Sequence, residues 1–470
     1  DWLKHARLIP GQAVVRTGEN GLEYLFIFLF INPFIVMTAA ADVIRQHLAL
    51  GLTRSRQLVE KTGFSQPTVS RALTELGDDI VRLGAGRSIQ YALKDHARGF
   101  DAVPIHRVTE AGQISPLGQL IPVRPDGFVM IQPDGTRLHS DGLPWWLMDM
   151  RPQGFMGRAY AASHASALGL PADTEQWSDA HVMHALLHQG HDAVGNLLVG
   201  DRAREVFLHM PQPVPVDRQT MYPELARAAA AGESPGSSAG GEQPKFVAYS
   251  ERGHVLVKYS AIDDNAVSER WRDLLLAEHH ALAMLGTPSQ VLDISGQRFL
   301  EVPRFDRVGA LGRIGVFSLR ALDAEFVGRA HEPWPVLVQA LAHSGVVQPE
   351  AAQATALRWA FGALIGNTDM HAGNLSFISS HGRPYQLSPA YDVLPMGFAP
   401  NRFGELNAAL APVNLLPIIP GEIWHQASQL ATVYLDRLRA DPLLSRGFAP
   451  CLQAMHQHLS EAQERVSRLA

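Results

Sequence analysis

The most strongly apolar stretch of the chain lies near its N-terminus. Residues 22–37 are almost continuously apolar and are interrupted by Glu23, Asn32 and Pro33. A membrane-spanning helix needs about 20 apolar residues, more than this run supplies. We weigh a membrane anchor, a buried or misfolded extension, and read-through upstream of the true start. We favour read-through, because Met37 opens an ordinary helical pattern. Residues 1–36 are therefore treated as an uncertain apolar extension outside the native protein, and no membrane association is expected.

The next periodic pattern predicts two short helices separated by a tight turn. Residues 55–63 form a helix that ends at glycine, and Ser65 caps a second helix with Pro67 in its first turn. The apolar side chains of this second helix, residues 68–76, fall on one face and are Val69, Leu73 and Leu76. Its opposite face is left free for a partner.

A predicted hairpin follows these helices. Residues 80–83 and 88–93 alternate as strands around a glycine-rich turn. We predict a winged helix-turn-helix DNA-binding domain over residues 37–98, which would act as a homodimer because paired half-sites usually require one. The alternative is a three-helix module that binds protein. The candidate DNA contacts are polar side chains of the second helix and the wing, namely Gln66, Thr68, Ser70, Arg71 and Arg87.

Short strands broken by turns are predicted over residues 100–150, and helices over residues 152–210. His184 and His188 lie one helical turn apart and could hold a metal. No acidic residue joins them at suitable spacing, so we expect solvent-facing or core histidines.

A loop of small residues precedes a second predicted hairpin. The loop covers residues 234–243, and strands 246–249 and 254–259 follow it. Glycine permits close backbone approach to phosphate, although a flexible linker would have a similar composition. The order of loop, strand, turn and strand, with Lys258 on the second strand, matches that of a kinase small lobe. The candidate nucleotide contacts in this region are Ser237, Ser238, Gly240, Gly241, Lys245 and Lys258, with Glu278 as a partner for Lys258.

A further strand, residues 298–302, runs into a predicted hinge. Residues 303–307 read Pro-Arg-Phe-Asp-Arg, and backbone groups here would meet adenine. Arg304 and Phe305 are the candidate contacts from this segment.

The densest cluster of chemically useful side chains follows a predicted helix at residues 351–366. Asp369, His371 and Asn374 lie within six residues, and Asp392 follows after a predicted hairpin of the length needed to return the chain. Phosphate transfer from ATP needs one group for the acceptor hydroxyl and two oxygen ligands for Mg²⁺. An Asp, an Asn and a later Asp have these types in this order. Residues 405–470 are predicted to be helical.

Composition narrows the class of protein. The 470 residues are 46% hydrophobic and 18% charged, which describes a folded globular chain. The net charge of −6 excludes a global basic field, so any DNA contact must be local. The single cysteine excludes an internal disulfide and a cysteine-rich zinc site, and a cytoplasmic location is expected.

Four motifs in order resemble the HipA-type serine/threonine kinases, which are toxins of bacterial toxin–antitoxin systems. They are residues 237–245, 303–307, 366–374 and 389–395, and the likeness spans roughly residues 100–440. With a helix-turn-helix in front, the chain looks most like the HipH (YjjJ) branch. The resemblance implies an α+β class, with a winged helix-turn-helix followed by a bilobed protein-kinase-like fold. The β-rich N-lobe would cover residues 99–310, and the helical catalytic C-lobe residues 311–470.

The resemblance also implies roles. Asp369 would be the catalytic base, with His371 in its loop, and Asn374 and Asp392 would hold Mg²⁺. Lys258 would contact ATP phosphates, and Phe305 would line the adenine site. In this family a serine of the glycine-rich loop is autophosphorylated, which expels the loop; Ser238 fits best and Ser237 is adjacent. Known targets are translation components such as aminoacyl-tRNA synthetases.

Two departures from the family pattern bear on these roles. Pro303 replaces a residue that is often acidic, which affects the adenine contacts. The fused DNA-binding segment is usually a separate antitoxin, so regulation would act in cis.

Other functions stay open on the sequence alone. One is a DNA-binding transcriptional repressor with an inactive, nucleotide-sensing kinase-like domain. Another is a metal-dependent hydrolase that uses Asp369, His371 and Asp392, although it lacks a second cluster for a two-metal site. A small-molecule kinase would use the same lobes.

Overall fold

The structure is a computed structural model and describes residues 33–231 and 243–469. It divides into two compact units. One contains residues up to Asp95 together with Val123–Pro125, and the other contains His96–Pro122 and the chain from Asp126 onward. Each unit is described by itself.

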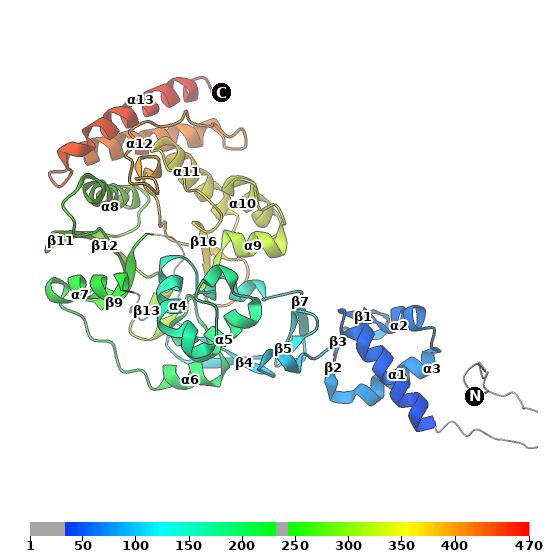
Figure 1. The fold of residues 1–470 in the computed structure, drawn as a ribbon. Helices are drawn as coiled ribbons and strands as arrows, with labels where there is room; N and C mark the ends of the chain where they lie inside the picture. The colour runs from blue at the N-terminus through cyan, green and yellow to red at the C-terminus, as the bar shows by residue number, and fades with distance from the viewer. Residues whose placement is uncertain (1–32, 232–242, 470) are drawn as a thin grey trace, which may run out of the picture. The chain divides into compact units, whose positions relative to one another are not determined.

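From residue 33 onward, the N-terminal unit forms three α-helices and a small antiparallel sheet (Figure 1). The helices are α1 (Pro33–Leu48), α2 (Ser55–Thr62) and α3 (Gln66–Leu76). The strand order is β1–β3–β2, with β1 at Thr53–Arg54, β2 at Ile80–Leu83 and β3 at Gln90–Leu93. The predicted helices and the predicted hairpin are thus confirmed.

The core of this unit explains why the two short helices form. Val69, Leu73 and Leu76 are buried against Leu58 and Ile44, so the predicted apolar face of α3 is correct. The Ser65 hydroxyl accepts a hydrogen bond from the Thr68 amide at 3.4 Å, and Gly63 ends α2 with φ of 72°. One prediction is wrong: α1 begins at Pro33 and not at Met37. Proline is tolerated in the first turn of a helix, so Pro33 starts this helix instead of interrupting it.

The second unit is mixed α+β and begins with a five-stranded sheet of order β7–β6–β5–β4–β8. Its strands are β4 (Val103–Val108), β5 (Ile114–Val123), β6 (Gly127–Ile131), β7 (Arg137–Ser140) and β8 (Leu197–Val199). The helices that follow this first run of strands are α4 (Gly154–Leu168), α5 (Asp179–Gln189) and α6 (Gly200–Leu208). Strands before residue 150 and helices after it confirm the prediction for this region.

A four-stranded antiparallel sheet of order β11–β12–β10–β9 forms the middle of the unit. The strands are β9 (Lys245–Ser250), β10 (Gly253–Tyr259), β11 (Gln290–Ile294) and β12 (Gln297–Pro303), flanked by α7 (Arg218–Ala230) and α8 (Ala266–Met284). Asn265 caps α8 by accepting from the Ser268 amide at 2.9 Å, so this helix starts before Trp271, where the apolar pattern began.

The rest of the unit is mostly helical. Its helices are α9 (Leu319–Phe326), α10 (Trp334–His343), α11 (Glu350–Leu364), α12 (Gly421–Ala440) and α13 (Ala449–Val466). Two small sheets complete it. One pairs β13 (Arg307–Val308) with β14 (Gly312–Arg313), and the other has the order β15 (Gly315–Ser318), β16 (Ser376–Ser379) and β17 (Gln386–Leu387). The prediction of helix over residues 405–420 is wrong. Pro412, Pro417 and Pro420 lie in this stretch, and each interrupts the backbone hydrogen bonds of a helix.

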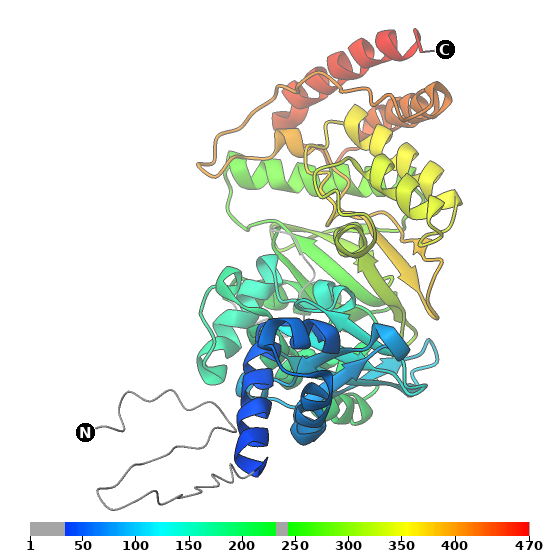
Figure 2. The same ribbon diagram turned by 90° about the vertical axis from the view of Figure 1, so that its right-hand side faces the viewer.

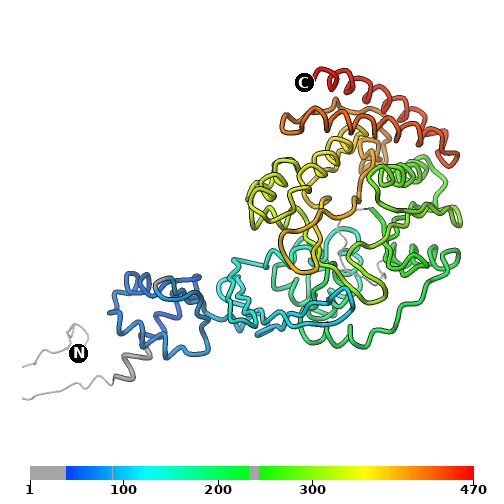
Figure 3. The backbone as a smooth tube through the Cα atoms, turned by 180° about the vertical axis from the view of Figure 1, so that it is seen from behind, coloured from blue at the N-terminus to red at the C-terminus, as the bar shows by residue number. Residues whose placement is uncertain are grey.

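Within this unit the C-terminal helices and the first strands lie at opposite ends, with the middle sheet between them (Figures 2 and 3). One core cluster joins α8 to the C-terminal helices: Leu274 and Leu282 of α8 pack with Phe361, Trp424 and Tyr434. Helix α8 therefore fixes the middle sheet against the helical part, and the polar groups of both surround one cavity.

Candidate active site

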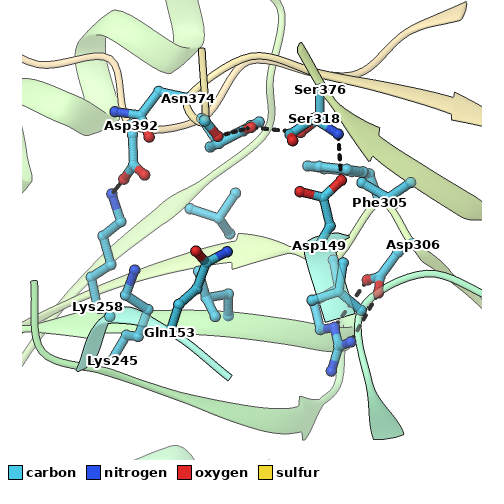
Figure 4. A pocket seen from close by; sticks show the side chains of 18 of the residues that line it. Asp149, Gln153, Lys245, Lys258, Phe305, Asp306, Ser318, Asn374, Ser376 and Asp392 are labelled. Atoms are coloured by element: carbon cyan, nitrogen blue, oxygen red, sulfur yellow. Dashed lines mark hydrogen bonds and ion pairs between the residues drawn. The ribbon is translucent and has the colours of Figure 1, made fainter. Parts of the chain in front are cut away.

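A cavity of about 720 Å³ lies between the middle sheet, the segment that follows α11, and residues 149–175 (Figure 4). Ligand-binding cavities commonly measure about 300–1,000 Å³. The sheet contributes Lys245 and Lys258, and the segment after α11 contributes Asn374 and Asp392. The cavity thus brings these four predicted contacts together with three others, Glu278, Arg304 and Phe305.

Lys258 is the centre of a buried charge cluster. Its Nζ donates to the two carboxylate oxygens of Glu278 at 2.6 and 2.7 Å and also contacts Oδ1 of Asp392. Lys258 pairs across the sheet with Lys245, so the two lysines lie side by side on neighbouring strands. The predicted contact between Lys258 and Glu278 is confirmed.

The cluster sets the charge on its two carboxyl groups. Burial would raise the pKa of Asp392, but the charges of Lys258 and Lys245 outweigh burial and hold that pKa below its ordinary value. Burial raises the pKa of Glu278, with Lys258 opposing the rise and Asp392 adding to it. Asp392 is therefore the carboxyl that stays ionised over the wider pH range and can bind a cation.

The segment after α11 is shaped by one glycine and two asparagines. Gly366 has φ of 81° and turns the chain away from the helix. The side-chain oxygen of Asn367 then accepts from the Asp369 amide at 3.0 Å. The Asn374 side chain donates to the Asp369 carbonyl at 2.8 Å and to its carboxylate at 3.3 Å. These bonds fix Asp369 relative to Asn374.

Asp392 adopts a conformation that is unusual for a residue with a side chain. Its φ is 53°, in the left-handed region. Such conformations persist where surrounding contacts enforce them, often at functional sites. Here the side-chain amide of Asn367 donates to the Asp392 carbonyl at 3.4 Å, and Lys258 contacts the Asp392 carboxylate.

Asp369 and His371 are two exposed residues of the segment after α11. Their side chains are 49% and 51% exposed, and His371 Nε2 is 3.7 Å from Asp369 Oδ1. His371 also accepts from the Gly373 amide at 3.0 Å through Nδ1. His371 lines the cavity, whereas Asp369 is not among the lining residues. The Asp369 carboxylate is thus half-exposed to solvent.

The predicted hinge residues make two different kinds of contact. Phe305 lines the cavity and lies 5.8 Å from Tyr391, centroid to centroid. Arg304 also borders the cavity, but its guanidinium binds the Asp306 carboxylate at 3.0 and 2.9 Å and lies 3.6 Å from Asp192. Its charge is therefore neutralised within the protein.

The lining residues that had not been singled out from the sequence include Asp149, Tyr391 and Arg320. Asp149 accepts from the Ser318 amide at 2.6 Å, and burial raises its pKa. The Tyr391 hydroxyl donates to the Gly373 carbonyl at 2.9 Å. Tyr391 lay within a quoted motif, but nothing in the pattern around Asp149 or Arg320 indicated a site.

Some predicted residues lie beyond the described part of the chain. Ser237, Ser238, Gly240 and Gly241 fall in residues 232–242, outside the described residues. Arg87 belongs to the connection between β2 and β3, and its side chain is likewise not described.

The candidate DNA contacts on α3 differ in exposure. Gln66, Ser70 and Arg71 are exposed, whereas the Thr68 hydroxyl is 2.9 Å from Ser65 Oγ within the helix cap. Gln66 also donates to the Ser55 hydroxyl at 2.8 Å. Arg71 is thus the exposed cation of this face.

No helix within residues 33–231 and 243–469 is long and apolar enough to cross a bilayer. Over the same residues, no three His, Cys, Asp or Glu side chains group as a metal site. Asn374 and Asp392 alone would suit Mg²⁺, which commonly takes one or two protein ligands and completes its shell with phosphate and water.

Comparison with known proteins identifies the family. Residues 100–208 match the middle domain of YjjJ-like toxins, and residues 237–416 match the HipA-like C-terminal domain. Toxin YjjJ of Escherichia coli K12 is 37% identical over 448 residues, which cover 92% of this chain and 100% of that protein. The chain belongs to the YjjJ-like toxins. The resemblance to the HipH (YjjJ) branch of HipA-type proteins is therefore confirmed.

Solved structures resemble this YjjJ-like toxin more distantly. HipA of a Shewanella oneidensis MR-1 toxin–antitoxin system, solved with HipB and operator DNA, is 17% identical with a TM-score of 0.45, covering 77% of this chain and 91% of that one. The Helicobacter pylori proinflammatory kinase CtkA is 11% identical with a TM-score of 0.35, covering 49% of this chain and 91% of that one.

Proposed function

We propose that this YjjJ-like toxin is an ATP- and Mg²⁺-dependent serine/threonine protein kinase that acts as the toxin of a toxin–antitoxin system. The observation that supports the proposal best is the cluster of Lys258, Glu278 and Asp392 in a cavity that also contains Asn374. A lysine–glutamate pair beside a metal-binding Asp and Asn is the arrangement that protein kinases need. The cavity would form between the lobes of a bilobed kinase-like fold.

Each group would have a separate task. Phe305 and Tyr391 would contact the base, and Lys258 and Lys245 would face the phosphates. Asn374 and Asp392 would hold Mg²⁺, which supplies positive charge to the transferring phosphoryl. Asp369 would orient the acceptor hydroxyl and take its proton, while the oxygen forms a bond to the γ-phosphorus and ADP leaves with the electrons of the broken bond.

The exposed position of Asp369 favours a protein acceptor over a small enclosed one. We propose a Ser or Thr of a translation component, such as an aminoacyl-tRNA synthetase, as the acceptor. Autophosphorylation at Ser238 or Ser237 would silence the enzyme.

The N-terminal unit would regulate expression through DNA. Its three helices and three-stranded sheet have the order of a winged helix-turn-helix, and α3 leaves Gln66, Ser70 and Arg71 exposed. We propose that α3 enters the major groove and that the wing carrying Arg87 contacts the backbone, in a homodimer.

The kinase assignment is tested with Asp369→Asn. The full chain is incubated with Mg²⁺ and ATP labelled at the γ-phosphate, and transfer to protein is followed by autoradiography and mass spectrometry. The wild type should label Ser238 or Ser237, and the variant should not, with an unchanged melting temperature. Asp436→Asn, which removes an exposed carboxyl of α12, is the matched control. Equal labelling of the Asp369 variant would refute the role of Asp369, and binding of ATP without any transfer would favour the nucleotide-sensing repressor.

A further inference from the structure

Arg320 is an arginine beside the catalytic segment that the proposed mechanism does not use. It is exposed, lies in the first turn of α9 and lines the cavity together with Lys258, Asn374 and Asp392. It also lines a second cavity of about 610 Å³ that adjoins the first through Asp149 and Ser318. Its side chain therefore lies where the two cavities adjoin.

The backbone fixes Arg320 to the segment that carries Asp369. The Arg320 amide donates to the Ala372 carbonyl at 2.9 Å, and the Leu319 amide donates to the Leu375 carbonyl at 2.7 Å. A Cβ added at Gly373 would collide with Nη2 of Arg320 and with the His371 ring. The guanidinium thus lies directly against the backbone between His371 and Asn374, and the glycine makes room for it.

The charges around the cavity leave this guanidinium available. Lys258 is shared between two carboxylates, Arg304 binds Asp306, and Arg151 pairs with Asp179 at 3.4 Å. Within the described part of the chain, Arg320 has no side-chain hydrogen bond or ion pair. The charge of Arg320 acts on Asp149, but that carboxylate already accepts from the Ser318 amide.

We propose that Arg320 contacts the phosphoryl group during its transfer and neutralises the charge that develops on its oxygens. This inference rests on the proposed kinase function. The planar guanidinium can donate two parallel hydrogen bonds to phosphate oxygens. Lys258 cannot take over this role, because its ammonium group is already shared between two carboxylates. As the γ-phosphorus leaves the bridging oxygen of ADP and bonds to the acceptor oxygen, the guanidinium donates to the oxygens that stay on phosphorus, and Asp369 takes the hydroxyl proton.

The test separates binding of the transition state from binding of nucleotide. Affinity for a fluorescent ADP analogue, mant-ADP, is measured with Mg²⁺ in the full chain, with and without aluminium fluoride, which mimics the transferring phosphoryl. The wild type should bind more tightly with fluoride. In Arg320→Ala, the increase in mant-ADP affinity caused by fluoride should be smaller by at least about tenfold. The affinity without fluoride should change by less than about threefold. The rate of phosphate transfer should fall about 10²–10³-fold. Arg320→Lys should fall between the two.

Two control variants test whether the effect is specific to the charge of Arg320. Arg329→Ala removes another exposed arginine just beyond α9 and should match the wild type. Arg320→Met keeps the aliphatic stem and should behave as Arg320→Ala if charge is the cause. A full fluoride effect in Arg320→Ala, or an equal loss of mant-ADP binding without fluoride, would overturn the inference. Failure of the wild type to bind mant-ADP would instead overturn the proposed kinase function.

Discussion

The side-chain amide of Asn367 donates to the main-chain carbonyl of Asp392 at 3.4 Å. The oxygen of the same amide accepts from the Asp369 amide at 3.0 Å. Asn367 is buried, so neither bond is readily replaced by water. One asparagine therefore links the segment that carries the proposed base to the residue that carries the proposed metal ligand.

Replacing Asn367 with Ala should disturb the chemistry more than the binding of nucleotide. Both segments would lose their common anchor, and a displacement of about 1 Å in a reacting group can cost about 100-fold in rate. We expect kcat for phosphate transfer to fall about 10–100-fold with KM for ATP little changed. Asn401→Ala removes an asparagine that supports an exposed turn and should leave both values unchanged. A rise in KM with normal kcat would contradict the positioning role.

Replacing Asp392 with Asn should abolish stabilisation by the metal–nucleotide complex. A ligand at 100 times its Kd stabilises the native state by about 2.7 kcal/mol. Melting is measured with Mg²⁺ and a non-hydrolysable ATP analogue, then with the analogue and EDTA. The wild type should show an Mg²⁺-dependent rise in Tm that Asp392→Asn lacks and Asp436→Asn keeps. An equal rise in all three proteins would exclude Asp392 as the ligand.

Asp306 should make stability depend on pH in the acid range. It is buried between Arg304 and Arg307; burial would raise its pKa, but the two guanidinium charges outweigh burial and hold it far below its ordinary value. Because the folded pKa is depressed, the carboxylate stabilises the fold above the unfolded pKa of about 3.9, and this is lost as the pH falls towards the folded pKa.

The variant Asp306→Asn should therefore cost about 3 kcal/mol of unfolding free energy at pH 7, because it leaves buried arginines short of negative charge. Urea unfolding should show the same difference in unfolding free energy between the wild type and Asp306→Asn from pH 8 to 5. This difference should narrow below about pH 4. Asp436→Asn should show no such difference at any pH. A difference that widens in acid would contradict the assigned sign.

Arg71 should contribute to DNA binding by the N-terminal unit. Sites are first selected with the full chain from random-sequence DNA, and Kd is then measured by fluorescence anisotropy at two salt concentrations. Loss of one arginine contact to a base or phosphate costs about 1–3 kcal/mol. Arg71→Ala should weaken binding accordingly, whereas Arg439→Ala on α12 should not. Unchanged affinity of Arg71→Ala for the selected site would place the DNA contact elsewhere.

Local patterns predicted much of this protein, because they depend on neighbours in the chain. Val69, Leu73 and Leu76 had to share a face of their helix, and Ser65 with Gly63 marked where helices begin and end. The spacing of Lys258 and Glu278 on a strand and the next helix also indicated their contact, which the structure confirms. The start of α1 was missed because a proline reads as a break, although it is tolerated in a first turn.

What the sequence determined by itself was the family, the order of its elements and the types of polar side chain at the site. The tertiary structure alone brought Asp149 and Arg320 to the cavity and neutralised Arg304 with Asp306 and Asp192. These outcomes depend on contacts between segments that are far apart in the chain, and no local pattern encodes which charge will find a partner. The pairing of Arg304 with Asp192, for example, joins the end of the middle sheet to the segment between α5 and β8.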